Sequence, residues 1–107
     1  MSLIKVGDAE AAAGRGEAAL AAYRESLVLA RRLRAALGDT PQVLGDVAFS
    51  LERMAAADAA PTADRRAAAQ GAVSLRQRLA DALPDMPAHR DRLAVAERLA
   101  ASLEDGR

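Results

Sequence analysis

Hydrophobic residues recur at steps of three and four along most of this chain, which is the spacing of amphipathic helices. The pattern is clearest over residues 18–37, where Ala, Leu, Arg and Glu predominate and no Gly or Pro interrupts. We therefore predict a long helix there, with a face broad enough to contact neighbours on two sides. Its main stripe, with the residues that widen it, comprises Leu20, Tyr23, Ser26, Leu27, Leu29, Ala30, Leu33, Arg34 and Leu37.

A shorter apolar stripe precedes the long helix, over residues 2–13. The two segments are joined by Gly-Arg-Gly at 14–16, which is too short for a phosphate-binding loop. Two helices with so short a connection are expected to form an antiparallel hairpin. Gly38, directly after the long helix, is a typical helix stop.

Proline marks the start of each later helix. Thr40 followed by Pro41 is a strong N-terminal signal, because a side-chain cap precedes a proline in the first turn. The other two breaks are at Pro61 and Pro87. The helices expected from these signals span residues 41–59, 62–83 and 87–103, followed by a frayed end at 104–107. No alternating strand pattern appears, so the predicted fold is all-α, with about five helices stacked as antiparallel hairpins.

The apolar composition predicts a closely packed but small core. Hydrophobic residues make up 51% of the 107 residues, but 29 of the residues are Ala, and Tyr23 and Phe49 are the only aromatic residues. Small side chains let helices approach closely. Gly71 in the fourth predicted helix either marks such an approach or only lowers the stability of that helix. A single domain of this kind buries little area per residue. We therefore expect a modest monomer or one that is helped by a partner surface.

The charges balance, with 15 basic and 15 acidic residues and no net charge. This argues against a general nucleic-acid or membrane-surface binder, which would normally be basic. Arginines near the end of the long helix could bind a phosphate or an acidic partner, but they also suit the helix dipole. No aromatic residue interleaves with the arginines to stack on bases. We expect exposed helical charge at Arg31, Arg32, Arg34, Arg65, Arg66, Arg76 and Arg78.

No residue pattern predicts a catalytic, cofactor or metal site. Cysteine is absent, which excludes disulfides and zinc–thiolate sites, and no base is placed to activate a serine. His89 is the only histidine, and we expect it at the surface without the further ligands that a metal needs. The opening residues do not resemble a secretory signal, and no run approaches the ~20 apolar residues of a membrane span. A cytoplasmic protein is therefore expected.

Three segments of the chain resemble one another. Their starts lie 48 and then 45 residues apart, which is a period typical of helical repeats. The segments are SLIKVGDAEAAAG from Ser2, SLERMAAADAA from Ser50 and VAERLAASLED from Val95.

With these repeats the chain resembles a tetratricopeptide-repeat protein whose units are longer than the usual ~34 residues. Val6-Gly7 stands where such a unit has a Leu-Gly pair, and Ala19, Tyr23 and Ser26 follow its small-aromatic-small pattern. The later units match less well, at Met54-Ala55, at Ala67, Gly71 and Ser74, and at Leu99-Ala100. The resemblance implies a short right-handed array, with one repeat over about 2–38, a second over about 41–83 and a half repeat over about 87–104.

The resemblance also implies a groove, lined by the first helix of each unit, that binds a peptide or a partner domain. The chain has one Lys and no Asn, so the subgroup that clamps a terminal carboxylate with those residues does not fit. The simplest interpretation of the recurring Glu-Arg pairs is a solvated helix face, and that of Phe49 is a core residue. The candidate groove residues are Ile4, Lys5, Asp8, Phe49, Glu52, Arg53, Ala56, Glu97 and Arg98.

Two hypotheses about function follow. The first is a protein-interaction module or scaffold without catalysis, which binds a protein or peptide and neither nucleic acid nor membrane. The second is a structural segment that forms a homodimer or belongs to a larger multidomain protein. A self-contact would then involve Leu3, Val6, Leu99 or Leu103. A small enzyme or a nucleic-acid binder is the least favoured interpretation.

Overall fold

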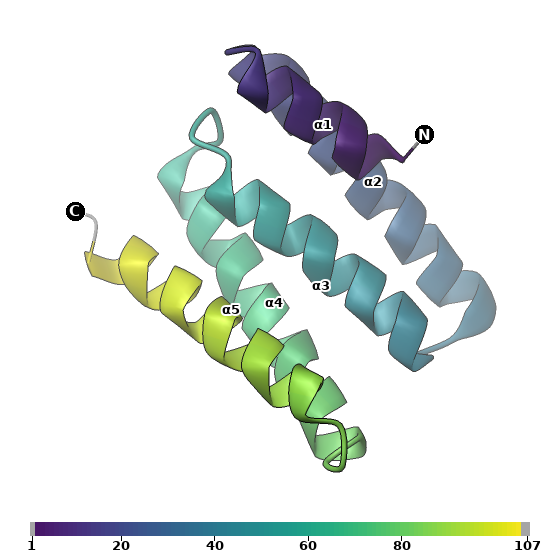
Figure 1. The fold of residues 1–107 in the computed structure, drawn as a ribbon. Helices are drawn as coiled ribbons and strands as arrows, with labels where there is room; N and C mark the ends of the chain where they lie inside the picture. Colours follow the sequence, from purple (N-terminus) through teal and green to yellow (C-terminus); the bar gives the residue numbers. More distant parts are fainter. Residues whose placement is uncertain (1, 106–107) are drawn as a thin grey trace.

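In the computed structural model, which describes residues 2–105, the chain forms five α-helices joined by short turns (Figure 1). No strand occurs within that range. This confirms the prediction of an all-α fold with five helices. The helices are α1 (Leu3–Ala12), α2 (Gly16–Leu37), α3 (Pro41–Ala56), α4 (Thr62–Ala82) and α5 (Pro87–Asp105).

The predicted cap at the start of α3 is confirmed. The Thr40 hydroxyl accepts a hydrogen bond from the backbone N–H of Val43 at 3.2 Å, and Pro41 follows in the first turn. Ser2 caps α1 in the same way, by accepting from the N–H of Lys5 at 3.2 Å. Each cap satisfies a backbone donor that has no partner within its own helix.

Two helix ends differ from the prediction. α3 ends at Ala56 rather than at residue 59, because Ala57 adopts an extended conformation with φ −80° and ψ 110°. α5 continues to Asp105 rather than stopping at residue 103, so residues 104 and 105 are helical and not frayed. The other residues of the predicted frayed end, 106–107, lie outside the described range.

The helices pack in two layers, with α1, α3 and α5 in one and α2 and α4 behind them (Figure 1). Each helix contacts the one before it, and α3 also contacts α5. The hydrophobic core cluster spans α2 to α5, and Ala48 and Ala55 of α3 and Ala72 of α4 are completely buried in it. A Cβ atom at Gly71 would lie 3.2 Å from Cδ1 of Leu51, so Gly71 does mark a close approach of two helices.

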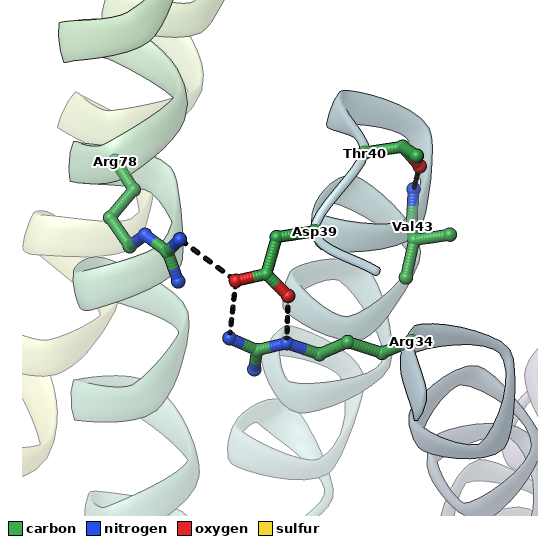
Figure 2. A network of polar contacts seen from close by, with 5 residues as sticks. All are labelled: Arg34, Asp39, Thr40, Val43 and Arg78. Atoms are coloured by element: carbon green, nitrogen blue, oxygen red, sulfur yellow. Dashed lines mark hydrogen bonds and ion pairs between the residues drawn. The ribbon is translucent and has the colours of Figure 1, made fainter. Parts of the chain in front are cut away.

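An ion-pair network holds the turn between α2 and α3 against α4 (Figure 2). Asp39, in that turn, accepts from Nε of Arg34 at 2.7 Å and from Nη2 of Arg78 at 2.9 Å. These two guanidinium groups lower the pKa of the Asp39 carboxyl from 3.8 to about 2. Gly38, just before it, has φ +81°, a backbone conformation that favours glycine.

Candidate interaction groove

A groove of about 660 Å³ lies between α1, α2 and α3. Its existence follows from helix lengths, because α1 has 10 residues and α2 has 22. At a rise of ~1.5 Å per residue, α1 is less than half as long as α2 and leaves the final turns of α2 uncovered on this side. Leu29 and Leu33 of α2 are consequently 44% and 47% exposed, and both line the groove.

The opposite wall of the groove comes from α3. Phe49 lines it and is 41% exposed, so the expectation that Phe49 is a core residue is wrong. The reason is its helical position. At ~100° per residue, Phe49 lies about 200° around α3 from Val47, which is buried, and therefore faces away from the core.

Small residues form the floor of the groove. The hydroxyl groups of Ser26 on α2 and Ser50 on α3 lie 3.0 Å apart and share a hydrogen bond. Ser50 and Ala30 are buried, while Leu29 and Leu33, which also line the groove, are partly exposed. The candidate set omitted all of these α2 residues because it contained only first-helix positions. The widening of the α2 stripe at positions 26, 29 and 33 was the available signal.

A cluster of four side chains closes one end of the groove. Nη2 of Arg53 lies 3.1 Å from Oδ2 of Asp8, and its guanidinium carbon is 5.0 Å from the centroid of the Phe49 ring. The Tyr23 hydroxyl donates to Oδ1 of Asp8 at 2.6 Å. Burial, and then this hydrogen bond, raises the pKa of Tyr23. Nε of Arg53 is buried and has no hydrogen-bond partner among the described residues.

The groove brings together five of the nine candidate residues, namely Ile4, Lys5, Asp8, Phe49 and Arg53. Ala56 lines a neighbouring hollow of about 490 Å³ on the far side of Arg53. Glu52 lies apart from both, in a depression of about 180 Å³ next to α5. Glu97 and Arg98 are exposed on α5 and line none of these three hollows. The nine positions therefore do not form one continuous surface.

The interpretation of Glu52 as a solvated residue and of Arg76 as exposed charge is wrong. Arg76 is only 6% exposed, and its Nε and Nη2 donate to the two carboxylate oxygens of Glu52 at 3.0 and 2.8 Å. Arg76 lies four residues after Ala72 and three before Leu79, so it shares the buried stripe of α4. A paired carboxylate is what makes a buried guanidinium tolerable.

Other polar residues on α4 and α5 are also less exposed than predicted. Arg65 donates to the Ala55 carbonyl at 2.8 Å and Arg66 to the Leu103 carbonyl at 3.0 Å, so both tie down helix ends. His89 is 8% exposed, because it lies seven residues, about two helical turns, before Ala96, which is buried on the inner stripe of α5. Its Nδ1 has no hydrogen-bond partner within the described range.

Among the side chains that the structure describes, those of residues 2–104, no three His, Asp or Glu residues are grouped so that they could hold a metal ion. Within residues 2–105, no helix combines the length and the apolar character that crossing a membrane requires. The chain was compared with protein-family models, curated proteins and solved structures, and none of them matches it. The tetratricopeptide resemblance therefore stays a prediction.

Proposed function

We propose that this chain is a protein-interaction module that binds a peptide or a partner domain in the groove between α1, α2 and α3. The observation that carries the proposal is the apolar wall of Leu29, Leu33 and Phe49, each between 41% and 47% exposed. Concave apolar surfaces with a polar rim are typical of binding sites. The proposal includes no catalytic step and places the protein in the cytoplasm.

Charged groups at the rim support a polar or peptide-like ligand. Lys5 and Asp46 line the groove and are exposed, and neither forms an ion pair with another described residue. Asp8 and Arg53 line it as a bound pair. A few polar groups around an apolar surface fix the orientation of a ligand, while the apolar contacts supply most of the affinity.

The tetratricopeptide-like organisation is part of this proposal. Two observations support it, the Tyr23 ring packed on Gly7 and the layer that α1, α3 and α5 form in front of α2 and α4. The proposed site is nevertheless broader than a groove of first helices. Ser26, Leu29 and Leu33 come from a second helix.

The test is a selection of peptides from a random display library on the full chain. The double variant Leu29→Ser, Leu33→Ser removes the α2 wall, so selected peptides are expected to lose their binding to it. The control is Val28→Ser, because Val28 is exposed to a similar extent on α2 but does not line the groove. Peptides that bind all three proteins equally would overturn the assignment of the groove.

The alternative function is self-assembly, in which a second copy covers the same apolar wall. Of the predicted self-contact residues, Leu103 is buried in the core and therefore cannot supply a free contact. Leu3 lines the groove and is half-buried. Light scattering at high concentration distinguishes the two functions, since self-assembly predicts a dimer that becomes a monomer in the Leu29→Ser, Leu33→Ser variant.

A further inference from the structure

We propose that the ligand of the groove is an amphipathic helix of a partner protein, which carries an acidic side chain toward Lys5 and a basic one toward Asp46. This inference rests on the proposed function and names the class of partner for the same site. It rests on three features of the groove, namely its position in the helix layer, the shape of its walls and the placement of its charges.

The groove lies where a helix would complete the front layer. Asp8 of α1 is bound both to Tyr23 of α2 and to Arg53 of α3, which sets the three helices in register. α1 begins at Leu3, about one and a half turns before Asp8. Beyond that start, α2 continues past Leu33 with no part of α1 in front of it. A helix placed there would have the same two neighbours as α1.

The α2 side of the groove has the shape of a surface on which helices pack. Leu29 and Leu33 are four residues apart and form a ridge, and Ser26 and Ala30 form a lower row beside it, also four residues apart. Rows of this spacing are the ridges and grooves through which helices pack against each other. A partner side chain would fit between the ridge and Phe49 on the opposite wall.

An extended peptide fits this surface less well. One common mode for extended ligands adds a strand to a sheet edge, and the part of the chain that the structure describes contains no strand. The backbone N–H and C=O groups of an extended segment that face Leu29 and Leu33 would find no hydrogen-bond partner on those side chains. A helix satisfies its own backbone groups and presents only side chains.

The charges at the rim define an order along the partner. Lys5 lies on the α1 side of the groove and Asp46 on the α3 side, and both are exposed without an ion pair among the described residues. Lys5 lies three residues before Asp8 and Asp46 seven before Arg53, so the Asp8–Arg53 pairing places Asp46 about one helical turn further along the groove from that pair than Lys5. A partner helix with charges in the complementary order would pair with both groups.

The experiment uses two synthetic peptides of about 14 residues, with Leu at positions i, i+3, i+4 and i+7. One has Glu near its N-terminal end and Lys near its C-terminal end, and in the other these charges are exchanged. A version of each with a central Pro cannot form a continuous helix. Binding to the full chain is measured by fluorescence anisotropy, for the wild type and for the double variant Lys5→Glu, Asp46→Lys.

We expect the wild type to prefer one charge order by about fivefold, the scale of one or two partly exposed ion pairs. The double variant should prefer the other order by a similar factor, and the Pro versions should bind at least about tenfold more weakly. If the Pro versions bind as well as their parent peptides, the ligand is not bound as a helix. If the double variant keeps the preference of the wild type, the proposed order of charges is wrong.

Failure of this inference is distinguishable from failure of the proposed function. If the helical peptides do not bind but library-selected peptides still depend on Leu29 and Leu33, the groove is a binding site and the helical ligand is wrong. If no peptide depends on Leu29 and Leu33, both proposals fail. A dimer that excludes the peptides would show that a second copy is the occupant.

Discussion

The ring of Tyr23 lies directly against Gly7, so that a Cβ atom placed at Gly7 would come within 2.4 Å of Cε1 of Tyr23. This contact joins α1 to α2, and the same Tyr23 donates to Asp8 in the cluster that closes the groove. The position of α1, and hence the shape of the groove, therefore depends on the absence of a side chain at residue 7.

Gly7→Ala is expected to lower the free energy of unfolding by about 1–3 kcal/mol, because the added methyl must displace the Tyr23 ring. Gly45→Ala is the matched control in α3, since a Cβ atom there meets no described atom within 4 Å. It should raise stability by about 0.5–1 kcal/mol through helix propensity. Urea unfolding measures both, and an equal effect of the two substitutions would contradict the packing described for Gly7.

Thr40→Ala is expected to cost about 1 kcal/mol of stability, because the Val43 N–H loses its side-chain acceptor (Figure 2). Thr62→Ala provides the comparison. Thr62 is the first residue of α4, and that helix has no side-chain cap. The loss at Thr62 should be smaller, and urea midpoints that rank the two variants in the opposite order would argue against the cap.

Glu52→Gln is expected to destabilise the chain strongly, by about 3 kcal/mol, because it leaves the buried Arg76 without a charged partner. Glu97 begins the second Glu-Arg dipeptide of the sequence and is exposed. Glu97→Gln should therefore change the free energy of unfolding by no more than about 0.5 kcal/mol. Thermal unfolding of the two variants tests this contrast, and similar melting temperatures would mean that the Glu52–Arg76 pair contributes little.

Asp39 is expected to make stability depend on acid pH. Its pKa is lowered from 3.8 to about 2 in the folded state, so its contribution is fully present above pH ~4. That contribution is lost as the pH falls from about 4 through about 2, because the carboxyl becomes protonated and its pairing with Arg34 and Arg78 weakens. Wild type and Asp39→Asn should therefore differ in urea midpoint at pH 6 and converge near pH 2. A constant difference across this range would contradict the network.

Local signals in the sequence were sufficient for most of the fold. Thr40 with Pro41, the glycine at position 38 and the prolines at 61 and 87 act on their own backbone, so they could be interpreted without knowledge of the neighbours. The end of α3 could not be predicted in this way. Alanines at 57 and 59 are good helix formers, and no local residue marks the extended conformation that the chain adopts at Ala57.

The errors at Phe49, Arg76 and His89 have a common cause, because each expectation followed residue type rather than helical position. The periodicity already placed Arg76 and His89 on inner stripes and Phe49 on an outer one. The groove itself lay beyond sequence reasoning for a different reason. The predicted ranges 2–13 and 18–37 already made the first helix shorter than the second, but the place of α1 along α2 and α3 is set by the contacts of Asp8 with Tyr23 and Arg53, which are tertiary.

The most direct test of the account is the mapping of backbone amide chemical shifts while a display-selected peptide is added to the full chain. Binding in the groove predicts the largest shift changes at Ser26, Leu29, Leu33 and Phe49. Val95 is also exposed and apolar, but it lies next to the smaller depression at α5, and its shift should stay constant. The largest changes around Val95 and the exposed face of α5, with the groove unaffected, would contradict the central claim.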